Sequence, residues 1–110
     1  MTAAAAIIAA ENRLCARNYA PLEIVLARGE GAHVWDVAGK RYLDFMSAYS
    51  AVSLGHGHPR ILRALREQSE RLSVISRAAY SDRLAPFLEK LCAVSGFAKA
   101  LPMNTGAEAV

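Results

Sequence analysis

The hydrophobic pattern of this sequence changes its period near Met46, and that change constrains the fold more than any other feature. Before it lie three short runs rich in β-branched and aromatic residues, at 23–28, 32–37 and 41–46. Gly29-Glu-Gly31 separates the first two runs, and Gly39 lies in the turn between the second and the third, where a left-handed backbone favours glycine. The pattern before Met46 therefore predicts three short antiparallel strands, preceded by a short helix within residues 8–16.

After Met46 the sequence predicts helices. Pro59 suits the first position of a helix that begins directly after His58, and an apolar stripe follows at helical spacing (Ile61, Leu62, Leu65 and Leu72). A second helix is expected within residues 81–94. Gly96 is a suitable cap past its end, and Pro86 marks either the start of this helix or a kink in it.

The segment 98–103 is short and mostly apolar, as expected of a strand in a covered sheet, and another helix is predicted directly after it. A meander followed by helix, helix, strand and new helix is typical of the opening of an α/β domain. We therefore predict an N-terminal helix and β-meander over residues 1–49, and the beginning of a larger α/β domain over residues 50–110. Because the last helix would have barely one turn, we expect the sequence to be a piece of a longer enzyme.

Composition and charge exclude several classes of protein. Hydrophobic residues make up 54% of the sequence and charged residues 21%, which excludes a disordered chain. The net charge of +3 is a weak basic bias, and the signs alternate at helical spacing in the densest basic run, residues 60–71, so no nucleic-acid binding is expected. No apolar run approaches membrane-spanning length. Because Cys15 and Cys92 lack the spacing of a disulfide framework, and no secretory leader is present, we expect a cytoplasmic protein.

Thr105-Gly-Ala-Glu108 is the most informative short motif. Thr-x-x-Glu predicts a capping box, in which Thr105 caps a helix and Glu108 reaches back to its backbone N–H. Gly106 has no β-carbon, so an anion can approach the free N–H groups of the first turn, where the helix dipole also favours negative charge. An ordinary capped helix is the alternative. No Gly-Lys-Ser or Gly-Lys-Thr loop is present, and Gly29-Glu-Gly31 lacks the third glycine of a dinucleotide fingerprint.

Two histidines and two tyrosines are further candidates for a site. His56 and His58 flank a glycine, but no Asp, Glu or Cys follows at ligand spacing, so a role in the loop and the helix cap is predicted and no metal. Tyr19 and Tyr49 lie in small polar segments, where a tyrosine can offer a hydroxyl and a ring face to a ligand. A loop tyrosine that is simply packed is the alternative.

A set of motifs, taken in order, carries a family resemblance. They are Asn18-Tyr-Ala-Pro21, Arg28-Gly-Glu-Gly31, Val34-Trp-Asp-Val-Ala-Gly39, Tyr42-Leu-Asp-Phe45, Gly55-His-Gly-His-Pro59 and Met103-Asn-Thr-Gly-Ala-Glu-Ala109. Together they resemble the opening of the class III aminotransferases that depend on pyridoxal 5′-phosphate, from about Asn18 to the last residue.

Three further segments narrow this resemblance. Within the class, Met46-Ser-Ala-Tyr-Ser-Ala-Val52, Ser76-Arg-Ala-Ala-Tyr80 and Leu101-Pro-Met-Asn-Thr-Gly106 are most similar to the members that act on ornithine. The members that act on acetylornithine or 4-aminobutyrate are similar elsewhere, but they do not usually have a tyrosine at the position of Tyr49.

The resemblance implies a fold type I enzyme with pyridoxal 5′-phosphate as its cofactor. Thr105, Gly106 and Ala107 would bind the cofactor phosphate. Tyr19 would contact the α-amino and carboxylate end of ornithine, and Tyr49 would direct the δ-amino group towards the cofactor. The implied reaction transfers this amino group to 2-oxoglutarate and gives glutamate 5-semialdehyde and glutamate, in an enzyme expected to be a homodimer.

No catalytic residue is assigned in this chain. Pyridoxal enzymes need a lysine that binds the cofactor and moves protons, together with an acidic partner for the pyridine nitrogen. In the family this lysine lies downstream, and Lys40, Lys90 and Lys99 fall in elements unrelated to its place. We therefore predict that the chain alone is inactive. The alternatives are another class III aminotransferase, for acetylornithine or 4-aminobutyrate, and a non-catalytic anion-binding module.

Overall fold

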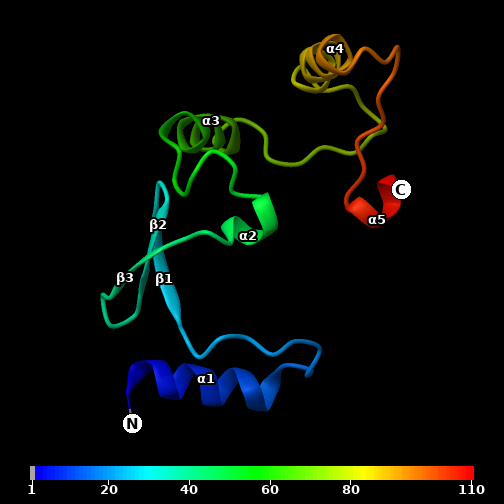
Figure 1. The fold of residues 1–110 in the computed structure, drawn as a ribbon. Coiled ribbons are helices and arrows are strands. Elements are labelled where there is room, and N and C mark those ends of the chain that lie inside the picture. Colours follow the sequence, from blue (N-terminus) through cyan, green and yellow to red (C-terminus); the bar gives the residue numbers. More distant parts are fainter. Residues whose placement is uncertain (1) are drawn as a thin grey trace. The chain divides into compact units, whose positions relative to one another are not determined.

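The computed structural model describes residues 2–110. Its elements follow the predicted order, apart from an added short helix at Ser47–Ser50 and the absence of the predicted strand at residues 98–103. They are α1 (Ala3–Leu14), β1 (Leu26–Glu30), β2 (His33–Asp36), β3 (Arg41–Leu43), α2 (Ser47–Ser50), α3 (Pro59–Ser69), α4 (Leu84–Ser95) and α5 (Gly106–Ala109) (Figure 1). Residues up to Ser69 form one compact unit and Glu70–Val110 a second. The predicted boundary near residue 49 concerns the longer enzyme and stays a prediction.

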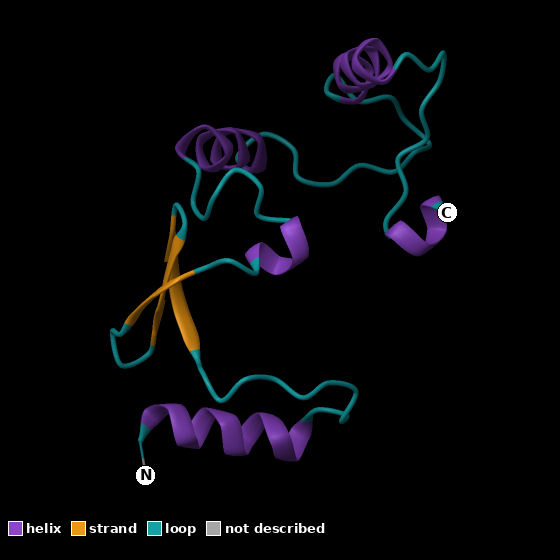
Figure 2. Cartoon of the chain, viewed as in Figure 1, coloured by secondary structure: helices purple, strands orange, loops and turns teal. Residues whose placement is uncertain are grey.

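The first unit contains the predicted three-stranded antiparallel sheet, in the order β1-β2-β3 (orange in Figure 2). Val34 pairs with Gly29 on one side and with Tyr42 on the other. Gly39 has φ 84° in the turn between β2 and β3, a backbone conformation that glycine adopts without strain. β1 is displaced from the predicted run 23–28, because it begins at Leu26 and continues through Gly29 to Glu30, with a register shift between Leu26 and Arg28. β2 and β3 are shorter than predicted, and β3 ends where the chain turns at Asp44.

The helices of this unit begin where local capping favours a start. The Thr2 hydroxyl accepts a hydrogen bond from the Ala5 N–H, so α1 begins within the alanine run and ends at Leu14, earlier at both ends than the predicted 8–16. Pro59 is the first residue of α3, as predicted, and the His58 carbonyl accepts the first helical hydrogen bond.

In the second unit, α4 confirms the predicted helix, and Gly96 ends it with φ 77°. Pro86 lies in the first turn, so it marks the start of the helix and causes no break. The prediction of a strand at residues 98–103 was wrong for this structure, since the segment is irregular and pairs with no other strand. An isolated strand leaves its backbone hydrogen-bonding groups unpaired, and this unit supplies no sheet to satisfy them.

Little apolar surface is buried in the described residues. Val34, in the central strand, is the one buried hydrophobic residue among residues 2–110, at 7% exposure. Large apolar side chains such as Phe45 and Tyr80 are 88% and 96% exposed. Because burial of apolar surface is the main driving force for folding, residues 2–110 have little of the stabilisation expected for a domain of this length.

Candidate active site

The two candidate tyrosines, thirty residues apart in sequence, meet in the first unit. The Tyr19 and Tyr49 hydroxyls form a hydrogen bond, although each side chain is otherwise exposed. This hydrogen bond raises the pKa of the Tyr49 hydroxyl above its usual value. Tyr19 also lines a hollow of about 490 Å³ between α1 and residues 20–26. The sequence identified both tyrosines as candidates but did not predict that they touch.

Tyr49 lies in a turn of left-handed backbone. The four residues of α2 are Ser47, Ala48, Tyr49 and Ser50, with φ values of 48°, 47°, 56° and 73°. Ala48 and Tyr49 have ψ values of 50° and 46°, close to those of an ideal left-handed helix. For L-residues this conformation costs roughly 1–2 kcal/mol each, so consecutive examples without glycine must be held by surrounding contacts. Sequence analysis expected a small polar loop here.

Asp44 provides contacts that hold this turn. Its Oδ1 accepts hydrogen bonds from the Met46 N–H at 3.0 Å and the Ser47 N–H at 2.9 Å. Its Oδ2 lies 2.7 Å from Nε2 of His56. The pKa of the Asp44 carboxyl lies below its ordinary value. The contact with His56 is the largest cause, and the hydrogen bond from the Ser47 N–H is the next.

The glycines of the resemblance motifs explain how His56 reaches this position. A β-carbon at Gly29 would lie 2.6–2.9 Å from atoms of the His56 side chain, so only glycine leaves room for the ring against β1. Gly55 has φ 82°, and a β-carbon there would lie 3.1 Å from the Gly31 backbone. The two glycine motifs therefore serve close packing of one loop on the end of a hairpin.

Sequence analysis missed Asp44 and the partner of His56. The available signal was an aspartate three residues before a small polar run that begins at Ser47, since an aspartate commonly accepts hydrogen bonds from N–H groups two or three residues ahead. The expectation that loop and cap geometry explain both histidines was correct for His58. It was incomplete for His56, whose ring contacts a carboxylate twelve residues upstream.

In the second unit, the predicted capping box is present. The Thr105 hydroxyl accepts a hydrogen bond from the Glu108 N–H at 3.2 Å, and the Glu108 carboxylate accepts one from the Thr105 N–H at 2.9 Å. A helix leaves its first N–H groups without intrahelical partners, and those of Gly106 and Ala107 are given to no acceptor within residues 2–110. A β-carbon built at Gly106 meets no atom within 4 Å. These residues fit a phosphate group, because they combine open space with unpaired donors.

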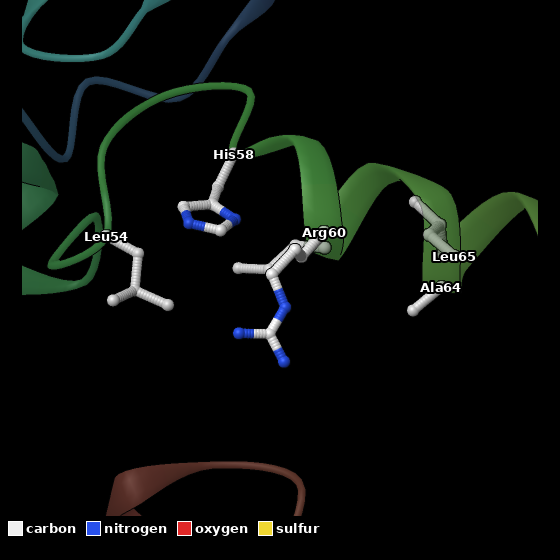
Figure 3. Close-up of a pocket in the computed structure, with 6 residues that line it drawn as sticks. Leu54, His58, Arg60, Ala64 and Leu65 are labelled. Atoms are coloured by element: carbon white, nitrogen blue, oxygen red, sulfur yellow. The ribbon is translucent and has the colours of Figure 1, made fainter.

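Another hollow lies along α3 and is lined by neither tyrosine of the pair. It measures about 640 Å³ and is lined mainly by apolar residues of α3 and of the loop before it, with Leu54 and His58 on one side and Arg60 on the other (Figure 3). His58 Nδ1 is buried and has no hydrogen-bond partner within the described chain. The hollow includes none of the candidate residues Tyr19, Tyr49 and Thr105, so we assign it no part in the site.

Comparison of the sequence with known protein families identifies the enzymes that share these elements. The family model for aminotransferase class III matches residues 14–110. The chain belongs to the class III aminotransferases. The members of this family depend on pyridoxal 5′-phosphate, and the open N–H groups of the Thr105 turn have the character that a phosphate group requires.

Individual relatives extend this result. The chain is 58% identical over 100 residues to an ornithine aminotransferase of Bordetella pertussis, covering 91% of this chain and 24% of that protein. It is 50% identical over 110 residues to ornithine aminotransferase 2 of Staphylococcus aureus, covering 100% of this chain and 28% of the relative. The chain thus spans about a quarter of the length of the curated relatives it matches.

Solved structures of class III aminotransferases share the fold. An acetylornithine aminotransferase from Elizabethkingia anophelis matches 99% of this chain and 28% of that chain, with a TM-score of 0.95 and 50% identity. An ornithine δ-aminotransferase from Plasmodium falciparum matches 98% of this chain and 28% of that chain, with a TM-score of 0.93 and 44% identity. These matches confirm the predicted fold, the N-terminal part of a pyridoxal phosphate-dependent aminotransferase. Within residues 2–110, no helix has the length and apolar character required to cross a membrane.

Proposed function

We propose that this chain is part of an ornithine aminotransferase, which transfers the δ-amino group of L-ornithine to 2-oxoglutarate and forms glutamate 5-semialdehyde and glutamate. The observation that carries the proposal is the hydrogen bond between the hydroxyl groups of Tyr19 and Tyr49. These two exposed side chains come from segments that are thirty residues apart in the sequence. Relatives named ornithine aminotransferase, at 50–58% identity, support the choice of amine.

Pyridoxal phosphate, when bound, supplies the electron sink that amino-group transfer requires. In this chain the Gly106 and Ala107 N–H groups would donate hydrogen bonds to its phosphate, and the Thr105 hydroxyl would adjoin the same group. Tyr19 would bind the α-amino and carboxylate end of ornithine. Tyr49 would orient the side chain of the substrate so that the δ-amino group, and not the α-amino group, faces the reacting centre.

The choice between the two amines is a difference between two binding poses. One contact worth about 1.4 kcal/mol shifts such a preference tenfold. Replacing Tyr49 with isoleucine removes its hydroxyl and the hydrogen bond to Tyr19, so we expect the kcat/KM for ornithine to fall about tenfold relative to those for 4-aminobutyrate and acetylornithine. The measurement is the ratio of these specificity constants in the full-length wild type and in Tyr49→Ile. An unchanged ratio, with folding and cofactor binding intact, would refute the role of Tyr49.

Acetylornithine is the second candidate substrate, because a solved acetylornithine aminotransferase is 50% identical to this chain. The same assay separates the two candidates. An ornithine aminotransferase uses free ornithine in preference to acetylornithine, whereas a wild-type preference for acetylornithine would overturn our proposal. We favour ornithine because Tyr49 is a residue that the acetylornithine members do not usually have.

We also predict that the 110-residue chain has no transaminase activity by itself. It lacks a lysine at the place that the family uses for proton transfer, so the general base of that step is missing. The isolated chain should also be only marginally stable, with weak protection over residues 59–110 in amide exchange, because so few apolar residues are buried. Ornithine-dependent turnover by purified chain free of host enzyme, or cooperative high protection of that region in the monomer, would contradict these predictions.

For the full-length enzyme we propose a homodimer in the cytoplasm. Free thiols at Cys15 and Cys92 support a reducing compartment. Exposed apolar side chains on several elements support burial against further protein surface, including a second subunit. Light scattering of the full-length enzyme measures the oligomeric state, and a monomer at assay concentration would contradict the dimer.

A further inference from the structure

We propose that Asp44 and His56 are positioning residues for Tyr49, because together they hold the left-handed turn that brings its hydroxyl to Tyr19. The inference deepens the proposed function and rests on it where it concerns the choice of amine. Within the described residues, the side-chain hydrogen bonds of Asp44 and His56 go to other groups than the tyrosine pair, so both would act through the backbone of the turn. Three features support this role: the backbone hydrogen bonds of Asp44 and His56, the hydrogen bonds of their side chains, and the positive φ values of the turn.

Both residues are anchored to the same end of the sheet by backbone hydrogen bonds. The Asp44 N–H donates to the Ala32 carbonyl at 2.9 Å. His56 exchanges a pair of hydrogen bonds with Gly31, at 2.8 Å and 2.9 Å. Gly31 and Ala32 form the connection between β1 and β2. The two side chains therefore meet on a frame that the hairpin fixes, and this frame does not depend on the turn that follows.

The Asp44 carboxylate uses both of its oxygens. Oδ1 accepts from the Met46 and Ser47 N–H groups, which open the turn, and Oδ2 contacts His56. The Asp44 side chain is 15% exposed and that of His56 27%. Limited access to water favours these hydrogen bonds over exchange with solvent, and an ionised acceptor strengthens them. His56 thus fixes the carboxylate, and the carboxylate fixes the start of the turn.

The turn needs such a hold because none of its four residues is glycine. With φ values between 47° and 73°, each β-carbon lies close to a carbonyl oxygen, and the isolated segment would relax to another conformation. Tyr49 is the third of these residues, so relaxation would carry its side chain away from Tyr19. A strained segment that carries a ligand-binding side chain is a recurrent arrangement at functional sites.

The test uses the full-length enzyme with Asp44→Ala, His56→Ala and the rescue variants Asp44→Asn and Asp44→Ala/Ala48→Gly. Asp44→Ala and His56→Ala should lower the ratio of kcat/KM for ornithine to that for 4-aminobutyrate, by about tenfold for Asp44→Ala. Asparagine keeps an oxygen for the two N–H groups, and glycine at position 48 adopts positive φ readily, so each should restore part of the ratio. Asp36→Ala is the matched control. It removes an aspartate with equivalent hydrogen bonds at the other turn, and it should lower the thermal midpoint while leaving the ratio unchanged.

Two readouts do not depend on activity. Amide exchange at Met46 and Ser47 should accelerate about tenfold or more in Asp44→Ala and stay unchanged in Asp36→Ala. The pKa of Tyr49, followed by NMR in tyrosine-labelled enzyme, should fall towards its ordinary value as the contact with Tyr19 is lost.

The possible outcomes separate the two proposals. Faster exchange with an unchanged selectivity ratio and an unchanged Tyr49 pKa would show that Asp44 is merely structural and would overturn the inference. If the wild type does not use ornithine, the proposed function fails. In that case amide exchange at Met46 and Ser47 and the titration of Tyr49 decide whether Asp44 and His56 position Tyr49. Faster exchange with a lowered Tyr49 pKa supports this role, and an unchanged Tyr49 pKa contradicts it.

Discussion

Two aspartates, Asp36 and Asp44, organise consecutive turns of the sheet with nearly the same hydrogen bonds. Asp36 Oδ1 accepts from the Ala38 and Lys40 N–H groups, both at 2.9 Å, and its Oδ2 accepts from the Tyr42 hydroxyl at 2.8 Å. Asp44 likewise uses one oxygen for two N–H groups ahead of it and the other for a side chain. The polar contacts alone do not distinguish a structural turn from a functional one.

The backbone after each aspartate does distinguish them. In the Asp36 turn, one glycine, Gly39, takes the positive φ that the hairpin requires. In the Asp44 turn, four consecutive residues with β-carbons take it, and one of them is Tyr49. The first turn is locally satisfied and joins two strands, whereas the second keeps a strained conformation that presents a side chain to Tyr19. Both turns have an aspartate that accepts backbone hydrogen bonds, so this feature does not mark the candidate site. The distinguishing feature is a run of positive φ values in residues other than glycine.

The largest expected effect comes from filling the space beside His56. In the full-length enzyme, Gly29→Ala would place a β-carbon within 2.6–2.9 Å of the His56 side chain and push it away from Asp44. We expect about 2–3 kcal/mol of destabilisation, at the upper end of the range for overpacking. The measurement is the local opening free energy from amide exchange at Met46, Ser47 and His56.

Gly39→Ala is the matched change at the other turn. A β-carbon there meets no atom within 4 Å, so the effect comes only from the positive φ and should be roughly 1–2 kcal/mol. The loss should appear in exchange at Ala38 and Lys40. If Gly29→Ala opens the Asp36 turn as much as the Asp44 turn, the two do not behave as separate units.

Glycine substitutions should have opposite signs in the two turns. Ala48→Gly removes left-handed strain of roughly 1–2 kcal/mol and adds an entropic cost of about 0.5–1, so a net stabilisation of about 0.5–1 kcal/mol is expected. Ala38→Gly relieves no strain, since Ala38 does not have positive φ, and should destabilise by about 0.4–1 kcal/mol. Thermal midpoints of the two variants check the signs, and a destabilising Ala48→Gly would argue that the turn is not strained in solution.

The smallest expected effect is on stability at acid pH. It should show which side chain lowers the pKa of each of the two aspartates. The Tyr42 hydroxyl is the main cause that lowers the pKa of Asp36, and His56 is the main cause for Asp44. Because each folded pKa lies below the ordinary value of about 3.9, the stabilisation is present above that pH and is lost as the pH falls through the folded pKa.

Removing one partner should move one carboxyl only. Tyr42→Phe should raise the pKa of Asp36 alone, and His56→Asn that of Asp44 alone, as measured by NMR titration of the carboxyl carbons. Tyr42 itself has a raised pKa through its hydrogen bond to Asp36, so its contribution is present below about pH 10 and is lost as the pH rises through the folded value. A shift of both carboxyl groups in either variant would show that the turns are coupled.

The sequence by itself determined the features that depend on a few neighbouring residues. Gly39 in its turn, Pro59 at the start of α3, Gly96 at the end of α4 and the capping box of Thr105 and Glu108 were all predicted correctly. Each follows from the backbone preference or hydrogen bonding of residues within four positions of one another. Motif order was sufficient for the family, which the comparison confirmed over residues 14–110.

Only the tertiary structure decided which distant groups meet. Tyr19 reaches Tyr49 across thirty residues. Asp44 reaches His56 across twelve, because Ala32 and Gly31 at the hairpin end hold the backbones of these two residues. The left-handed turn has no local signature, since its residues lack glycine and adopt this backbone only while outside contacts hold it. Residues 98–103 show the converse: an apolar run has the propensity of a strand, but a strand forms only when neighbouring strands satisfy its backbone.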